Sequence, residues 1–395
     1  MKVATAFSTA TSPDRALQEA FAAVSQELGA TPELIVVSYS EAYEAQALAR
    51  AVSELPPSVN VHGASSCLGA MTAQGGQLAG GPLLAMLALS DPEGCYGVGS
   101  ADLGSQPRAA GALATQRAIA AAARPGENPS LIWLSAAPGA EESILLGIAD
   151  VVGPNVPVFG GSAADNAIKG AWSQIERGGA HVQGVVVAVL YPSGELSHAF
   201  SSGYEPTGAR GRITAAGPRC IVEIEGRPAA LWYDEKAEGA IHGKLGGGDI
   251  LAETTLHPLG RRVATIAGVD QYLLIHPSGV DAQQGLTVFA DVAVGDELVL
   301  MSGSKQTLVA RIRTVVEAAR AAAPPGFVPA GALVIYCAGC MLAVRDEIEH
   351  VVTGLRETLG GAPFLGAFTF GEQGCITRGT NGHGNLGMSI VLLGA

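Results

Sequence analysis

The chain has few charged and few aromatic residues for its length. Of its 395 residues, 15% are charged and 5% are aromatic, whereas 48% are hydrophobic and 53 are glycine. Low charge combined with high hydrophobicity excludes an intrinsically disordered chain. The scarcity of aromatic side chains predicts cores built from alanine, valine, leucine and isoleucine. The length allows two or three domains, each large enough to bury a full core.

Basic residues are also scarce, and they form no run. The chain has 23 basic and 36 acidic residues, which gives a net charge of −13. Nucleic acid and anionic membranes bind through clustered lysine and arginine, so we expect neither as a partner. No apolar run approaches the roughly 18 residues of a membrane span. The first residues lack the apolar core of a signal peptide, and we therefore expect a cytoplasmic protein.

Cysteine is infrequent, with six residues in the whole chain. Without a secretory signal, so few cysteines are not expected to form a disulfide framework. We expect them to be free thiols or ligands.

Three segments of the chain share a glycine that follows a proline-containing stretch and precedes a glycine-rich loop. These glycines are Gly63, Gly160 and Gly366. Glycine at the end of a strand lets the backbone approach another element closely, and its recurrence indicates an internal repeat. Apolar runs followed by helical patterns precede the three glycines, at residues 34–38, 131–135 and 333–337. The repeated unit therefore reads strand, helix, strand, helix, strand, loop, strand.

This repeat predicts an α/β fold of internally repeated units in two lobes, with a β-rich middle segment. Continuously apolar runs such as residues 34–37 are typical of strands covered on both faces. We expect residues 1–200 to form one α/β domain with two repeats. We expect residues 201–395 to form a second domain. That domain would contain a β-rich segment at 201–297 and a third repeat at 298–395, which begins with a strand at 298–302.

An ordered set of short motifs resembles the FIST domain family, which is described as paired N- and C-terminal regions. The resemblance spans nearly the whole chain. No single motif is diagnostic, whereas their order along the chain is fairly specific. The motifs are residues 63–66, 160–166, 204–208, 223–229, 257–260 and 369–372, and Asn385.

The resemblance implies a sensory protein that binds a small ligand in signal transduction. Amino acids or related small molecules have been suggested as ligands of this family, and some similar proteins bind haem to sense gases. FIST regions usually accompany a kinase, a cyclase or a receptor module. This chain carries no output domain, so we expect its signal to pass to a separate signalling protein. It also departs from the family pattern at Cys340, where a basic residue is expected.

Five polar residues on the glycine loops are candidate ligand-binding residues, because binding groups concentrate on loops held by a rigid scaffold. Asp165, Asn166 and Glu372 could bind an amine or a hydroxyl group. Ser65 and Ser66 could donate to a carboxylate. The alternative is that these side chains only bond to the backbone of their own turns.

The cysteines near the motifs are a second group of candidates. Cys337 and Cys340 form a C-x-x-C at the end of an apolar strand, directly before a helix. Together with Cys67 we assign them to the ligand site. If Cys67, Cys337, Cys340 and Cys375 converge, four thiolates could bind zinc or an iron–sulfur cluster. The alternative is that they are small buried side chains beside a pocket, with one reactive thiol among them.

Two further alternatives concern haem and catalysis. A haem sensor needs an axial ligand, and His62, His257 and His383 lie in or beside the motifs. A cysteine enzyme could pair Cys67 or Cys337 with His383. The chain has no nucleophile elbow, zinc-protease motif or phosphate loop, so enzyme is the minority interpretation. We expect the ligand site between the lobes, where the glycine loops approach the Cys337–Cys340 turn. The composition is also compatible with a homodimer.

Overall fold

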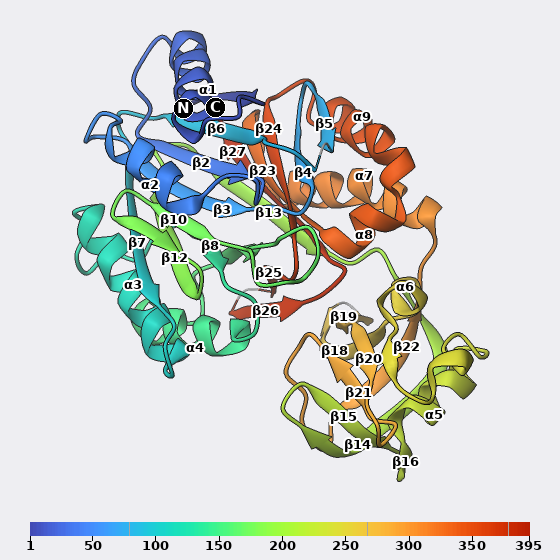
Figure 1. Cartoon of the computed structure of the whole chain (residues 1–395). Coiled ribbons are helices and arrows are strands. Elements are labelled where there is room, and N and C mark those ends of the chain that lie inside the picture. The colour runs from blue at the N-terminus through green and yellow to red at the C-terminus, as the bar shows by residue number, and fades with distance from the viewer. Residues whose placement is uncertain (79, 267, 378) are drawn as a thin grey trace.

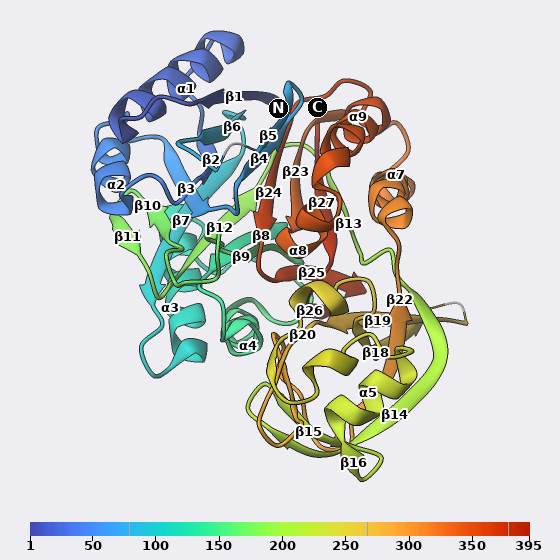
Figure 2. The same ribbon diagram turned by 45° about the vertical axis from the view of Figure 1, so that its right-hand side comes forward.

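The computed structural model describes residues 1–78, 80–266, 268–377 and 379–395. The chain forms a larger body with three repeated units and a smaller body made by residues 205–302 (Figure 1). The two termini lie beside each other at the end of the larger body that is farthest from the smaller one (Figures 1 and 2).

Three six-stranded sheets form the larger body, and each takes four strands from one unit and a hairpin from another. The first has the order β1 (Lys2–Ser8), β6 (Leu84–Ser90), β2 (Leu34–Tyr39), β3 (Asn60–Ser65), β10 (Gln174–Glu176) and β11 (Gly179–His181). The second has the order β26 (Thr380–Gly384), β25 (Glu372–Thr377), β9 (Val158–Ser162), β8 (Leu131–Ala136), β12 (Gly184–Tyr191) and β7 (Cys95–Asp102). The third has the order β13 (Leu196–Ser201), β27 (Met388–Gly394), β23 (Pro329–Cys337), β24 (Phe364–Thr369), β4 (Gly69–Thr72) and β5 (Gly75–Leu78).

Helices cover the outer faces of the three sheets, and the inner faces pack against one another. Within one strand, Ile35 and Val37 pack against helices, while Leu34 and Val36 belong to a central core shared by all three sheets. Both faces of the central strands are therefore dry, which explains their continuously apolar sequence. The covering helices are α1 (Pro13–Leu28) and α2 (Ala45–Ser53), α3 (Pro107–Ala121) and α4 (Glu141–Val152), and α7 (Lys305–Ala322), α8 (Ala338–Ala343) and α9 (Ile348–Thr358).

The repeated glycines lie where a hairpin from one unit joins the sheet of another. Gly63 in β3 is paired with Ile175 of β10, Gly160 in β9 with Gln373 of β25, and Gly366 in β24 with Met71 of β4. A Cβ atom on Gly63 would lie 2.6 Å from Ile175, and one on Gly366 would lie 2.8 Å from Met71. The repeated glycine therefore lies where the hairpin of another unit pairs with the sheet.

The smaller body is inserted in the third unit, between β13 and α7, and has its own core around Trp232 and Tyr233. Its sheet has the order β17 (Gly248–Asp249), β20 (Pro277–Val280), β21 (Leu286–Val288), β15 (Cys220–Ile224), β14 (Glu205–Gly217), β22 (Glu297–Ser302), β18 (Leu259–Ile266) and β19 (Val269–Ile275), and β16 (Arg227–Pro228) pairs with β15. Two short helices, α5 (Ala229–Lys236) and α6 (Leu251–Thr254), lie in the connections.

The α/β class, the internal repeat, the two lobes and the β-rich middle segment are confirmed. One strand assignment was wrong. Residues 298–302 lie in β22, which pairs with β14 and β18 of the smaller body. The first strand of the third unit is β13, which pairs with β27. In the repeated unit the first strand directly precedes a helix, and β22 occupies that place because it directly precedes α7. The sequence pattern cannot show that an insertion separates the true first strand, β13, from the rest of its unit. The domain limits 1–200 and 201–395 stay a prediction.

Gly160→Ala tests the tight contact at the repeated glycine. Gly160 has φ +148°, and a Cβ there would lie 1.9 Å from the backbone oxygen of Leu134. Because backbone atoms cannot give way as a flexible side chain does, we expect a loss of about 1–3 kcal/mol in unfolding free energy. Urea unfolding measures it, with Gly243→Ala as control because a Cβ on Gly243 meets nothing within 4 Å. Equal stability of the two variants would contradict this account of the repeat.

Candidate functional site

The loops that follow the parallel strands meet the smaller body around one cavity of about 710 Å³. The larger body contributes a segment after each of the three repeated glycines and the turn after β23. The lining residues from this body include Cys67, Pro138, Gly139, Glu141, Asn166, Ala167, Ile168, Trp172, Cys337, Ala338, Gly339, Leu342, Thr369, Phe370 and Asn385. Those from the smaller body include Arg219, Asp249, Leu251, Ala252, Thr255, Leu256, His276 and Phe289. The cavity is therefore an interface between the two bodies.

The walls of the cavity are largely apolar and include three aromatic side chains. Trp172 and Phe370 contact each other edge to face, with ring centroids 6.2 Å apart. Phe289 lies in the opposite body, where its ring contacts that of His276. Ile168 and Leu342 remain 46% and 51% exposed although both are large and hydrophobic. Exposed apolar groups at a concave surface are typical of ligand sites.

Two buried hydrogen-bond donors on the cavity-lining residues have no partner in the described part of the chain. Asn385 accepts the backbone N–H of His276 through Oδ1 at 3.1 Å, while its Nδ2 is unpaired. The indole Nε1 of Trp172 is likewise buried and unpaired. Leaving a buried donor unsatisfied costs about 1–3 kcal/mol, so both groups favour a bound acceptor.

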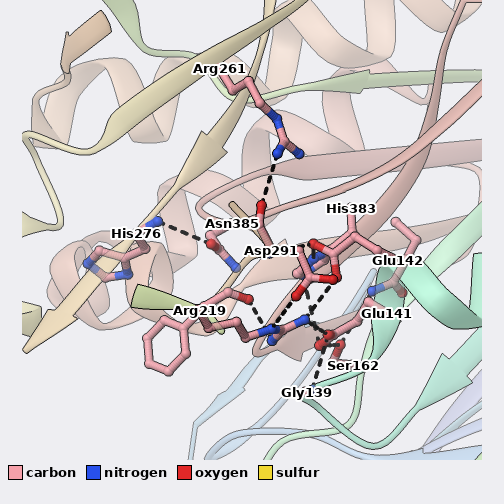
Figure 3. Close-up of polar contacts among 12 residues, drawn as sticks. Gly139, Glu141, Glu142, Ser162, Arg219, Arg261, His276, Asp291, His383 and Asn385 are labelled. Atoms are coloured by element: carbon pink, nitrogen blue, oxygen red, sulfur yellow. Dashed lines mark hydrogen bonds and ion pairs between the residues drawn. The ribbon is translucent and has the colours of Figure 1, made fainter. Parts of the chain in front are cut away.

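Beside the cavity, Arg219 joins the smaller body to helix α4 (Figure 3). Its Nη2 lies 2.6 Å from Glu141 and 2.9 Å from Glu142, and its Nε lies 3.1 Å from Asp291. The ring of His383 completes the group, with Nδ1 3.0 Å from Glu142. Glu141 and His383 are each 2% exposed, so these charges are taken out of water and depend on one another.

The network changes the ionisation of its members. Burial would raise the pKa of Glu142, but the hydrogen bond with His383 and the surrounding positive charge outweigh it and lower that pKa to about 2. Burial would lower the pKa of His383, but attraction to Glu141 and Glu142 outweighs it and raises that pKa. The folded state therefore favours ionised carboxylates at Glu141 and Glu142 beside the Arg219 guanidinium, and it favours the protonated form of His383.

Three of the ligand-site residues predicted from sequence line the cavity, namely Cys67, Asn166 and Cys337. Asn166 also ties two loops together, because its Oδ1 accepts the backbone N–H of Leu68 at 2.6 Å. Burial raises the pKa of Cys67 to about 12, and the nearby carboxylates of Asp165 and Glu41 add to the shift.

Three other predicted residues, Asp165, Ser65 and Ser66, form hydrogen bonds with the backbone near the cavity. Asp165 accepts backbone N–H groups from four residues of the loop that follows it, Ala167, Ile168, Lys169 and Ala171. Ser65 accepts from the backbone N–H of Ser173, and Ser66 accepts from that of Phe368. Asp165 thus bonds to the backbone of its own turn, whereas Ser65 and Ser66 bond to backbone that is distant in the sequence.

Glu372 and Cys340 are fully buried beside the site. Glu372 accepts the hydroxyl of Thr369 and the backbone N–H of Gly387, each at 2.9 Å. Burial dominates and raises the pKa of Glu372 to about 8. Cys340 lies near the hydroxyl of Tyr204, at 3.6 Å.

The four motif cysteines do not gather into one metal site. Cys375 packs against the central core, whereas Cys67, Cys337 and Cys340 belong to the core beneath α7, α8 and α9. Among the described residues, one group of three possible ligands has all its donor atoms within 4.8 Å of one another, and it consists of Glu141, Glu142 and His383. The Arg219 guanidinium already supplies the positive charge there.

Sequence reasoning missed Glu141, Glu142, Arg219, Trp172 and His276. The two glutamates follow the second repeated strand and its Pro-Gly turn, and this place at the carboxyl end of a strand could have singled them out. No local sequence pattern marks Arg219 as a site residue, because its partners come from a distant part of the chain.

Arg219→Met tests the link between the bodies. Removing the guanidinium leaves the buried Glu141 without its cation, so we expect a loss of about 3–5 kcal/mol in unfolding free energy. Arg212→Met is the matched control, since Arg212 and Glu297 form an ion pair whose side chains are 57% and 58% exposed. Such a pair is worth about 0–1 kcal/mol. Similar losses in both variants, measured by urea unfolding, would show that the network does not hold the bodies.

The pH dependence of stability tests His383. Its folded pKa is raised, so its contribution is complete below the unfolded value of about 6.5 and is lost as pH rises through the folded pKa. We therefore expect His383→Gln to lose more stability at about pH 6 than at about pH 9. His350→Gln is the control because that side chain is 74% exposed. A loss that does not change between these two pH values would argue against an ionised His383.

Comparisons with known proteins give two family matches and a similar solved structure. The FIST N domain model matches residues 33–227, and the FIST C domain model matches residues 244–375. Curated proteins give no match. A crystal structure of a cyanuric acid hydrolase from A. caulinodans is similar over 99% of this chain and 98% of that one, at 12% identity and a TM-score of 0.38, which is too low to support an argument about activity.

The family matches indicate the class of protein. In the described part of the chain, every helix is too short or too polar to cross a bilayer. FIST domains are associated with sensory signal transduction and small-ligand binding. By its two domain matches, which cover most of the sequence in order, the chain belongs to the FIST family.

Proposed function

We propose that this protein is a sensor that binds a small organic molecule reversibly in the cavity between its two bodies and signals through a separate protein. The cavity itself is the observation that carries the proposal. Its volume of about 710 Å³ lies within the range of small-molecule sites, about 300–1,000 Å³, and its walls come from all three units and from the insertion.

The lining favours a largely apolar ligand that carries a hydrogen-bond acceptor. Trp172, Phe289 and Phe370 offer flat apolar surface. The unpaired donors on Asn385 and Trp172 can bond to a carbonyl or similar oxygen. Glu141 and Arg219 neutralise each other at the cavity edge, so neither is left to require an opposite charge on the ligand.

Ligand binding at this interface can be transmitted as a change in the relative position of the two bodies. The chain crosses between them twice, before β14 and after β22. A molecule that contacts both walls stabilises the arrangement in which the walls are closest, and so shifts the population towards a closed form. A partner protein that recognises the closed form would receive the signal. The cytoplasmic location and the homodimer stay predictions.

The haem and metal alternatives find less support. His62 is hydrogen-bonded to the backbone oxygen of Val186, and His383 is held by Glu142. Of the described histidines, His276 lines the cavity, and its Nε2 lies 3.2 Å from the backbone oxygen of Leu251. The four motif cysteines lie in two different cores, which also weakens the metal alternative. The cysteine-enzyme alternative finds less support because burial raises the pKa of Cys67 to about 12 and so disfavours its thiolate.

Filling the cavity tests the proposal. Ala252 is exposed on α6 and lines the cavity, so Ala252→Trp should place an indole in the ligand space without disturbing a core. Native mass spectrometry of the protein after incubation with a cell extract should show a bound small molecule. We expect the variant to bind that molecule about tenfold more weakly or worse. Ala109→Trp, on the exposed face of α3, should bind normally.

Two results would contradict the proposal. One is equal binding by Ala252→Trp and Ala109→Trp, which would place the ligand elsewhere. The other concerns closure and comes from small-angle scattering of the wild type with the purified ligand. If the scattering profile is unchanged at saturating ligand, the proposed closure of the two bodies does not occur. A rise in melting temperature alone would not rescue the proposal, because any ligand of the folded state raises it.

A further inference from the structure

Cys337 and Cys340 are adjacent thiols with different access to the cavity. Cys337 ends β23 and is the N-cap of α8, while Cys340 lies in the first turn of that helix. Cys337 lines the cavity, whereas Cys340 is fully buried behind it. The two cysteines are three residues apart at the start of one helix, which is the C-x-x-C spacing at which two thiols can form a disulfide. A small solute in the cavity can therefore reach Cys337, whereas Cys340 can react only with groups buried beside it.

A buried arginine lies next to this pair without a carboxylate partner. Arg311 on α7 is 3% exposed, and its guanidinium lies 4.5 Å from the ring centroid of Tyr336. Its Nη1 donates to the backbone oxygen of Leu386 at 2.7 Å, while Nε and Nη2 are buried and have no hydrogen-bond partner in the described residues. A buried cation needs a counter-charge, since an isolated charge in the interior is very costly.

The sulfur of Cys340 is placed to provide that counter-charge. It interacts with the same guanidinium and with the hydroxyl of Tyr204. Burial would raise the pKa of Cys340, but the hydrogen bond from Cys337, the attraction of Arg311 and the contact with Tyr204 outweigh burial and lower it. Geometry places the same sulfur near the arginine, because Cys340 and the Arg311 guanidinium share the backbone oxygen of Leu386, at 3.5 and 2.7 Å. These contacts favour the thiolate of Cys340 over that of Cys337.

Metal binding is not favoured at this pair. No third histidine, cysteine, aspartate or glutamate joins the two thiols in a ligand group among the described residues. The positive charge of Arg311 opposes a bound cation as well. Two vicinal thiols, one of them ionised, are instead the requirement for forming a disulfide.

We propose that Cys337 and Cys340 are a redox-active dithiol that a small hydroperoxide, entering through the cavity, oxidises to a disulfide. The proton shared by the two sulfurs moves to Cys340, and the Cys337 thiolate attacks the peroxide. The O–O bond breaks, an alcohol (water in the case of hydrogen peroxide) leaves after taking up a proton, and Cys337 becomes a sulfenic acid. The Cys340 sulfur, losing its proton, then attacks the Cys337 sulfur and releases water. Overall, the two sulfurs with their one shared proton, one proton from the solvent and one hydroperoxide give one disulfide, one alcohol and one water.

Oxidation would alter the wall of the cavity as well as the thiols. The disulfide removes the negative charge that faces Arg311, and it ties the start of α8 to its first turn. Ala338, Gly339 and Leu342 of this helix line the cavity. The dithiol goes beyond the proposed ligand binding and does not depend on it, because the disulfide can be detected without any ligand.

Mass spectrometry of the full chain tests the proposal. The reduced protein is treated with one equivalent of hydrogen peroxide, unfolded in an alkylating agent and digested with trypsin. Cys337 and Cys340 fall in one fragment, residues 321–345. We expect this fragment to lose two hydrogen atoms, to resist alkylation and to recover with dithiothreitol. Cys67 lines the same cavity without a neighbouring thiol and should stay fully alkylated, which makes it the internal control.

Variants separate the role of each group. Cys337→Ser and Cys340→Ser should each abolish the disulfide, whereas Cys95→Ser, which lies outside the cavity, should leave its rate unchanged. Arg311→Met should slow oxidation about tenfold or more, because without the guanidinium the pair of sulfurs takes up a second proton and no thiolate is left to attack. The proposal is overturned if the wild-type fragment remains alkylatable at a peroxide dose that oxidises Cys67, or if Cys337 pairs with another cysteine. The wild-type experiment decides this even if a variant fails to fold.

Discussion

The exchange of hairpins between the three units is the interaction on which the rest of the structure depends. No unit completes its own sheet, because β4 joins β24, β10 joins β3 and β25 joins β9. Each exchange brings the loops on either side of the hairpin to the same end of the larger body. Gly63 and Gly366 permit it by leaving room for the side chains of the incoming hairpin, whereas Gly160 leaves room for the backbone of Leu134 in its own unit. The ligand cavity is a consequence of this closed arrangement.

The inserted body turns that loop-lined end into an enclosed site. Strand pairing holds the three units together, whereas side-chain charges link the insertion to α4 through Arg219, Glu141 and Glu142. Charged contacts of this kind are directional and depend on every member. They act beside an apolar contact, because Leu274, Val299 and Met301 of the insertion belong to the same buried core as α7, α8 and α9.

Much of the fold could be predicted from the sequence. The alternation of Leu34 and Ile35 between two cores, the apolar strands and the recurring glycines are local patterns with direct structural causes. Of the predicted site residues, Cys67, Asn166 and Cys337 line the cavity, and their role in ligand binding stays a prediction. Asp165, Ser65 and Ser66 are hydrogen-bonded to loop backbone, and a residue type that suits a ligand suits a turn equally well.

The sequence by itself determined the repeated unit, the α/β class and membership of the FIST family, because periodicity and ordered motifs are properties of short segments. Only the tertiary structure decided that β13 rather than β22 begins the third unit, that Arg219 meets Glu141, and that Arg311 lies buried beside Cys340 without a carboxylate. These relations join residues far apart in the chain. Their energies depend on burial and distance, which no local pattern records.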